Sequence, residues 1–258
     1  MDLGLRGKVA LVTGSSRGIG RAIALCLAGE GCRVALSSRG GADLDAAVSE
    51  ARARAADDTA AVGLTGDVTT AGGVQAVADG ALAAFGGVDV LVNNVGGSGA
   101  RTWDAIDESD LQLILDKNLW PAFRMSQALL PQMKARGGGA IIMITSIWGR
   151  EAGGGPSYNI AKAAEMSLSK AMARDLARDR IRVNAVAPGS VLFPGGGWER
   201  RQKQDPTGIA AFVERELPFG RFGRPEEIAD VVAFVASPRA SWVAGACLTV
   251  DGCQSRAF

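Results

Sequence analysis

The chain of 258 residues contains no histidine. This absence excludes the Ser-His-Asp and Cys-His pairs of many hydrolases, and it excludes zinc held by imidazole. We expect no bound metal. If the protein is an enzyme, a group other than imidazole must move its protons.

Cysteine, net charge and long apolar runs are also scarce. The four cysteines form no CxxC pairs at zinc spacing, so they are interpreted as reduced thiols of a cytoplasmic protein, with structural bridging as the alternative. With 28 basic and 27 acidic residues, the chain carries a net charge of +1, which predicts no nucleic-acid partner. It shows no secretory leader and no apolar run near the roughly 20 residues of a membrane span. We therefore expect no membrane association.

What the sequence does contain is an alternation of short apolar runs with longer helical patterns. The nearly continuous runs suit parallel strands that are covered on both faces. Together with the Ala-rich helical stretches 43–56 and 72–85, they predict an α/β fold, a single doubly wound domain over residues 1–258. The expected strands are 9–12, 34–36, 61–64, 88–92, 140–144, 181–186 and 248–250.

A glycine-rich stretch interrupts this alternation late in the chain. Residues 188–205 include the run Pro194-Gly195-Gly196-Gly197 and are interpreted as irregular. Such an excursion is either a functional lid or a disordered loop. We expect a substrate lid over residues 190–217, in which Phe193 and Trp198 would cover an apolar part of the substrate.

The first predicted strand runs into a phosphate-loop pattern, Thr13-Gly14-Ser15-Ser16-Arg17-Gly18-Ile19-Gly20, followed at once by a helix. Gly14 permits the tight turn, Gly18 allows a pyrophosphate to approach, and Gly20 lets helix and strand pack closely. The helix N-terminus offers free N–H groups to phosphates. A tight turn without ligand is the alternative.

The end of the second strand carries Ser38 and Arg39, where an acidic residue would favour NAD. An arginine there accommodates the 2′-phosphate of NADP, and Arg17 would add a second positive charge. The alternative is that Arg39 is a solvated surface residue. After the third strand, Asp67-Val68 is a candidate contact for adenine.

Tyr158 and Lys162 are four residues apart and share one face of a predicted helix. A nearby ammonium stabilises a phenolate, which would supply a general acid without histidine. Ser146 lies twelve residues before Tyr158, at the end of the fifth strand, and offers a hydroxyl to a carbonyl oxygen. The spacing Tyr-x-x-x-Lys alone is common, and the alternative is that the two residues lie on the surface without a catalytic role.

Taken in order, the motifs resemble those of the short-chain dehydrogenases/reductases over nearly the whole chain. The matching segments are 13–20, 67–68, 93–96, Asn118, Ser146, Tyr158 with Lys162, 186–189, 224–227 and 250–252. The resemblance implies a Rossmann fold and, in most members, a homotetramer.

The resemblance also implies a role for each matching residue. Tyr158 would be the acid/base, Lys162 would bind the nicotinamide ribose, Ser146 would hold the substrate carbonyl, and Asn118 would anchor a water of a proton relay. The expected catalytic residues are thus Asn118, Ser146, Tyr158 and Lys162. Asn93 and Gly96 would brace the fourth strand, and Val191 would offer its main chain to the carboxamide. The expected cofactor contacts are Gly14, Ser16, Arg17, Gly18, Ile19, Gly20, Ser38, Arg39, Asp67, Val68, Asn94, Gly96, Tyr158, Lys162, Pro188, Gly189 and Val191.

The chain departs from the family pattern at a few positions. Val95 replaces the usual alanine, and the Ser146–Tyr158 spacing is one residue short, which Gly153-Gly154-Gly155 would absorb. Leu192-Phe193 stands where many members have a threonine that binds the carboxamide. Cys253 replaces a common glycine.

The sequence thus predicts an NADP(H)-dependent enzyme that reduces a ketone to a secondary alcohol, close in appearance to the 3-oxoacyl-acyl-carrier-protein reductases. An NADP-dependent sugar or polyol dehydrogenase is the first alternative, and a dinucleotide-sensing module without turnover is the second. The substrate is expected to be a small carbonyl or alcohol compound, free or carrier-bound. Basic residues Arg136, Arg178 and Arg180 would dock an acidic carrier or form a solvated face.

Overall fold

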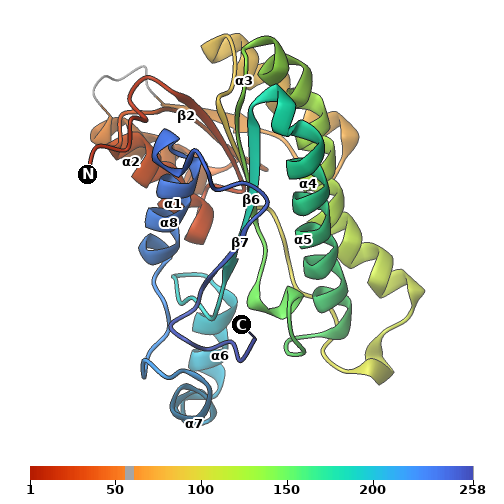
Figure 1. The fold of residues 1–258 in the computed structure, drawn as a ribbon. Helices are drawn as coiled ribbons and strands as arrows, with labels where there is room; N and C mark the ends of the chain where they lie inside the picture. The colour runs from red at the N-terminus through yellow and green to blue at the C-terminus, as the bar shows by residue number, and fades with distance from the viewer. Residues whose placement is uncertain (56–60, 258) are drawn as a thin grey trace.

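The computed structural model describes residues 1–55 and 61–257. Its seven parallel strands form one sheet in the order β3-β2-β1-β4-β5-β6-β7, with helices on both faces (Figure 1). The predicted doubly wound fold is confirmed, and each expected strand is present with bounds shifted by no more than two residues. The strands are β1 Val9–Thr13, β2 Arg33–Ser38, β3 Ala61–Thr65, β4 Val90–Asn93, β5 Gly139–Ile144, β6 Ile181–Pro188 and β7 Cys247–Val250.

Three helices cover each face of the sheet (Figure 1). α1 (Gly18–Gly29), α2 (Ala42–Arg54) and α8 (Pro225–Ala236) pack on one face. α3 (Ala71–Phe85), α4 (Glu108–Ala135) and α5 (Pro156–Leu176) pack on the other. The helix expected over 43–56 ends at Arg54, and residue 56 lies outside the described residues. Single turns of 3₁₀ helix occur at η2 Trp103–Ala105, η3 Ile147–Gly149, η4 Ala177–Asp179 and η5 Pro238–Ala240.

Burial on both faces explains the continuous apolar runs. In β1, Ala10 and Val12 join the core beneath α1 and α8, whereas Val9 and Leu11 join the core beneath α3 and α4. All five residues of β1 are buried. A strand in this position has no polar face to present, so its sequence does not alternate.

The sheet order places one opening at a defined point. From β1 the chain winds outward through β2 to β3, and from β4 it winds the opposite way to β7. At the carboxyl ends of β1 and β4 the connections therefore diverge, and ligands of open α/β sheets bind in the crevice at such a switch point. The phosphate-loop motif predicted from the sequence follows β1 and therefore lies at this switch point.

The segment 188–205, which was expected to be irregular, contains the helix α6 (Gly197–Gln204), so that expectation is wrong for its second half. A further helix, α7 (Pro206–Glu216), completes the segment 190–217. Asp205 caps α7 by accepting a hydrogen bond from the Gly208 N–H at 2.8 Å, and Pro206 suits the first turn. The ring of Trp198 packs 4.7 Å from that of Phe212. This packing half-buries Trp198 within the segment, and its contact with a substrate stays a prediction.

The four cysteines, all within the described residues, are free thiols. Among residues 1–55 and 61–257, no helix combines the length and the apolar character needed to cross a membrane.

Cys253 is one of two described residues other than glycine with a positive φ, at +67°. Its N–H donates a hydrogen bond to the Asp251 carboxylate at 2.9 Å, which fixes this turn. A side chain with a β-carbon makes the left-handed conformation unfavourable by roughly 1–2 kcal/mol. The turn therefore explains why a glycine is common at this position.

We predict that Cys253→Gly increases the free energy of unfolding by up to about 1 kcal/mol, because the strain is relieved while the unfolded chain gains some entropy. Urea unfolding followed by circular dichroism measures the change. Cys253→Ser keeps the β-carbon and serves as the control, with stability near that of the wild type. Equal stability of the glycine and serine variants would contradict the prediction.

Candidate active site

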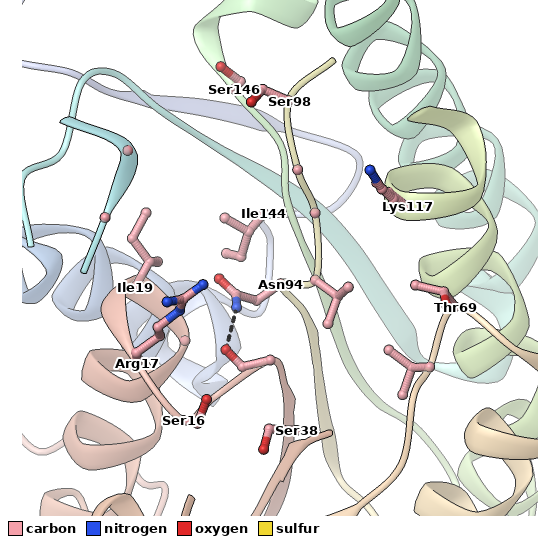
Figure 2. A pocket seen from close by; sticks show the side chains of 18 of the residues that line it. Ser16, Arg17, Ile19, Ser38, Thr69, Asn94, Ser98, Lys117, Ile144 and Ser146 are labelled. Atoms are coloured by element: carbon pink, nitrogen blue, oxygen red, sulfur yellow. Dashed lines mark hydrogen bonds between the residues drawn. The ribbon is translucent and has the colours of Figure 1, made fainter. Parts of the chain in front are cut away.

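A cleft of about 1100 Å³ opens at the switch point between β1 and β4 (Figure 2). One wall is the phosphate loop with Ser16, Arg17 and Ile19, and the floor is the end of β4 with Asn94. Ser146, Tyr158 and Lys162 line the same cleft. The sequence motifs, which are separated by up to 148 residues between Gly14 and Lys162, are thus brought together in one space.

The glycines of the phosphate loop are required by its geometry. Gly14 and Gly18 have φ of +63° and +58°, which favour glycine. A β-carbon on Gly20 would lie 2.4 Å from the carbonyl oxygen of Gly14. α1 begins at Gly18, and Arg17 at its N-cap supplies no side-chain cap, so the first N–H groups of the helix remain available to an anion. The loop therefore fits a dinucleotide pyrophosphate.

Asn94 fixes the phosphate loop to β4. Its side-chain amide donates to the carbonyl oxygens of Thr13 and Gly14 at 3.0 and 3.1 Å, and its N–H donates to the Thr13 hydroxyl at 2.9 Å. Figure 2 shows the Asn94 side chain directed at this loop. Asn93 instead points into the core, where its amide donates to Ser126.

Ser38, Arg39, Asp67 and Val68 line the end of the cleft beyond β2. The Asp67 carboxylate accepts bonds from the Thr69 hydroxyl and N–H at 2.7 and 3.0 Å. These bonds, and the nearby guanidinium of Arg39, hold the pKa of Asp67 below its usual range. Asp67 therefore stays ionised, and two arginines line this end of the cleft: Arg39, and Arg124, whose guanidinium donates to the Thr69 carbonyl oxygen at 2.8 Å.

Tyr158 and Lys162 lie one turn apart on α5, as predicted. The Lys162 Nζ lies 5.7 Å from the centroid of the Tyr158 ring, and it donates a hydrogen bond to the Ile144 carbonyl oxygen at 3.1 Å. Ser146 follows β5 and caps η3, where its hydroxyl oxygen accepts from the Trp148 N–H at 3.2 Å. The hydroxyl proton of Ser146 thus remains available as a donor.

Asn118 is fully buried and does not line the cleft. Its amide donates to the carbonyl oxygens of Gly97 and Ile114 at 2.9 and 2.8 Å, and its oxygen accepts from the Gly97 N–H at 3.1 Å. A β-carbon on Gly96 would lie 2.7 Å from the Asn118 oxygen and 3.2 Å from the Lys162 Nζ. Asn118 therefore holds the cleft wall beside Lys162, and its part in a proton relay stays a prediction.

Pro188 and Gly189 line the cleft as expected, whereas the Val191 side chain is buried in the core. Val191 forms a parallel bridge with Gly223, and the bonds of this bridge use the Ser190 carbonyl and the Leu192 N–H. This pairing directs the N–H and C=O of Val191 to the other side of the segment. That orientation suits the expected carboxamide contact.

The short connection between Ser146 and Tyr158 depends on its glycines. A β-carbon on Gly153 would lie 2.1 Å from the Trp148 ring, which packs against the glycine run. Gly154 has a φ of +68°. The glycines thus let the loop close over Trp148, as the sequence suggested.

Several residues of the cleft were missed from the sequence. Lys117 lines it beside the 94–98 segment (Figure 2), and Arg200 lines it from α6. Phe193, which the sequence analysis had named as a lid residue, also lines the cleft and lies against Gly18, where an added β-carbon would meet its ring at 2.7 Å. Lys117 could have been found from the sequence, because it directly precedes the predicted site residue Asn118. No sequence feature pointed to Arg200, because the helix that carries it was not expected.

The three arginines considered for carrier docking lie elsewhere. Arg136 follows α4 and pairs with Asp89 at 3.0 Å, while Arg178 and Arg180 precede β6. These positions are at the amino ends of β5 and β6, whereas the cleft lies at the carboxyl ends. The surface that they form is remote from Tyr158.

Comparisons with known proteins agree with this geometry. The family model described as enoyl-(acyl carrier protein) reductase matches residues 14–253. The chain is 38% identical over 255 residues to the 3-oxoacyl-(acyl-carrier-protein) reductase of Escherichia coli strain K12, which covers 97% of this chain and 98% of the relative. It is 34% identical over 252 residues to the 7alpha-hydroxysteroid dehydrogenase of the same strain, with 97% and 95% covered.

Solved structures give the same result. L-sorbose reductase from Gluconobacter frateurii, complexed with NADPH and L-sorbose, superposes with a TM-score of 0.93 at 35% identity over 100% of both chains. A 7 alpha-hydroxysteroid dehydrogenase complexed with NADH and 7-oxo glycochenodeoxycholic acid superposes with a TM-score of 0.89 at 34% identity, covering 99% and 97%. The chain therefore belongs to the short-chain dehydrogenase/reductase family. It is an oxidoreductase of CH–OH and C=O groups that binds a nicotinamide dinucleotide.

We predict that Gly20→Ala weakens dinucleotide binding by at least about tenfold, because overpacking by one methyl group costs roughly 1–3 kcal/mol and α1 must move away from Gly14. Titration of cofactor fluorescence measures the affinity. Gly29→Ala, at the other end of α1, meets no atom within 4 Å and is the matched control. Cofactor affinities that are the same in both variants and the wild type would contradict the prediction.

Proposed function

We propose that the protein is an NADPH-dependent reductase that converts a ketone to a secondary alcohol, with Tyr158 as the proton donor. The observation that carries the proposal is the shared cleft: Ser146, Tyr158 and Lys162 line a space whose other wall is the phosphate loop. A module that only senses a dinucleotide has no need of these three side chains.

The residues divide the chemistry as follows. The bound nicotinamide supplies the hydride. The Ser146 hydroxyl donates a hydrogen bond to the substrate carbonyl oxygen, and the Tyr158 hydroxyl gives that oxygen its proton. The Lys162 ammonium stabilises the phenolate that remains and binds the nicotinamide ribose. Asn118 holds the wall at Gly96 and Gly97, next to the path by which a proton returns to Tyr158.

Arg39 supports NADPH as the preferred cofactor. It lies at the end of the cleft where the 2′-phosphate would bind, with the Ser38 hydroxyl beside it. The structural relatives include a complex with NADPH and one with NADH, so cofactor choice varies among them and depends on the residues of each chain.

The segment 190–217 supports the assignment of a substrate lid. Phe193 and Arg200 line the cleft from this segment, and α6 and α7 lie at the open end of the molecule near the C-terminus (Figure 1). A reduced, cytoplasmic setting agrees with the four free thiols. A homotetramer agrees with large exposed apolar side chains such as Trp242, which is 99% exposed.

A sugar or polyol substrate is the second candidate, because L-sorbose reductase superposes over the whole chain. A panel of an acyclic ketone, a 3-oxoacyl thioester, a ketose and a 7-oxosteroid, each assayed with NADPH, separates these classes. Turnover of none of them, despite cofactor binding, would favour the sensing module.

For Tyr158→Phe we predict a fall in turnover of at least roughly a hundredfold, the lower end for a general acid. The substitution keeps the ring, so folding and NADPH binding should persist. Steady-state rates on the best substrate of the panel, with cofactor binding as the control, provide the measurement. Turnover near that of the wild type would remove Tyr158 from its role.

For the cofactor, we predict that the wild type favours NADPH over NADH by roughly 10- to 150-fold, because a hydrogen bond to a charged group contributes about 1.5–3 kcal/mol. Arg39→Asp should reverse this preference, since a carboxylate repels the 2′-phosphate and accepts from ribose hydroxyls. The ratio of kcat/KM for the two cofactors measures it. A wild type that already prefers NADH, or a ratio that Arg39→Asp leaves unchanged, would make Arg39 a surface residue.

A further inference from the structure

The catalytic lysine has a buried partner that the proposed mechanism does not use. The Glu165 carboxylate lies 2.7 Å from the Lys162 Nζ, and the two side chains are only 3% and 4% exposed. Glu165 is three residues after Lys162 on α5, on the face that packs into the protein. A buried carboxylate is rare unless it is paired, so the sequence retains this charge beside the lysine at a cost in desolvation.

The hydrogen bonds of Lys162 show how its third donor is directed. An ammonium has three N–H groups. One donates to the Ile144 carbonyl oxygen at 3.1 Å and one to Glu165 at 2.7 Å. The Nζ also lines the cleft and lies next to Gly96. Two fixed acceptors thus leave one N–H for the cleft, on the side of Tyr158.

We propose that Glu165 is a positioning residue that acts through Lys162: it fixes the ammonium beside Tyr158 and, by its negative charge, opposes ionisation of the phenol. The proposal rests on the role proposed for Tyr158. Its consequence is that Tyr158 stays protonated to higher pH, which is the form that a reductase needs.

The charges around the pair support this assignment. Within the described part of the chain, Lys162 is the charged group that acts on Glu165, and Glu165 and Tyr158 are those that act on Lys162. From α4, Lys117 faces the cleft, and Asp116 accepts from Gln112. The other ionisable side chains on the elements around α5 bond elsewhere or are exposed: Glu108, Asp110, Arg124, Lys134, Arg150, Lys170, Arg174, Asp175, Arg178, Asp179 and Arg182.

The electrostatics give the direction of the effect. Burial lowers the pKa of Lys162, but the carboxylate of Glu165 and the oxygen of Tyr158 raise it, and the net direction is upward, so the ammonium persists. Burial raises the pKa of Glu165 to about 7 against the opposing effect of Lys162. Above that pH the pair is close to neutral and stabilises a phenolate weakly. When Glu165 is replaced by a neutral residue, we expect the attraction of the Tyr158 oxygen and the hydrogen bond to the Ile144 carbonyl to keep the proton on Lys162 against its burial. The ammonium then acts on the phenol without the opposing carboxylate and stabilises the phenolate more strongly.

The composition of the chain allows a direct test, because Tyr158 is the only tyrosine. The ultraviolet absorbance of tyrosinate therefore reports Tyr158 alone, with Tyr158→Phe as the blank. We expect Glu165→Gln to shift the midpoint of this titration to lower pH by about one unit, the change produced by about 1.4 kcal/mol of charge interaction. The pH at which ketone reduction declines on the alkaline side should fall by the same amount.

The matched control is Asp175→Asn, which removes one exposed carboxylate from the same helix and should leave the midpoint unchanged. Glu165→Met, with a side chain of similar length, provides a second variant with the same expected direction. Circular dichroism at each pH confirms that the variants remain folded.

An unchanged or higher midpoint in Glu165→Gln would overturn the proposal. Loss of fold in both Glu165 variants, where Asp175→Asn stays folded, would also overturn it and make Glu165 a structural residue. The absorbance titration needs neither cofactor nor substrate. An inactive wild type would therefore count against the proposed reductase, whereas the titration decides the role of Glu165 by itself.

Discussion

The hydrogen bonds from Asn94 to Thr13 and Gly14 are the contacts on which the cleft depends. β1 and β4 are neighbours in the sheet, but their chains leave in opposite directions. Ser15 fixes the phosphate loop to β2, and the bonds of Asn94 fix it to the 94–97 segment on the other side. That segment in turn bonds to Asn118 and abuts Lys162. One asparagine thus links the glycine-rich loop to the wall beside Lys162.

The fold and most of the cleft could be predicted from the sequence because their constraints are local. A buried parallel strand must be apolar throughout, and a turn with positive φ favours glycine. The strand Val9–Thr13 and the turn at Gly14 can therefore each be recognised from one short segment of sequence. Tyr158 and Lys162 could be recognised for the same reason, since helical spacing alone puts them on one face of the helix. The order of such segments then defines the doubly wound sheet.

The remaining features depend on contacts between distant segments. Trp198 was expected to cover substrate because nothing near it in sequence could bury it, but Phe212 and Phe222, on and beyond α7, surround its ring. Asn118 was identified, but its burial behind Gly97 was not, since that depends on how α4 meets the loop after β4. Arg200 belongs to a helix whose pattern was obscured by glycines.

Where a protein without histidine uses a tyrosine as its acid, the phenol ionises far above neutrality by itself, and neighbouring charges must adjust it. In the proposed mechanism the Lys162 ammonium stabilises the phenolate of Tyr158, and too strong an effect would deprive the proposed acid of its proton. An isolated ammonium in a low-dielectric wall would act on the phenol with its full charge. A carboxylate 2.7 Å behind it weakens that effect, because the pair acts on the phenol as a dipole. The fold can place Glu165 there without opening the cleft, since α5 already carries both residues and its inner face is closed by β5 and β6. The proposed proton donor, the lysine beside it and the carboxylate behind that lysine thus all lie on one helix, from Tyr158 through Lys162 to Glu165.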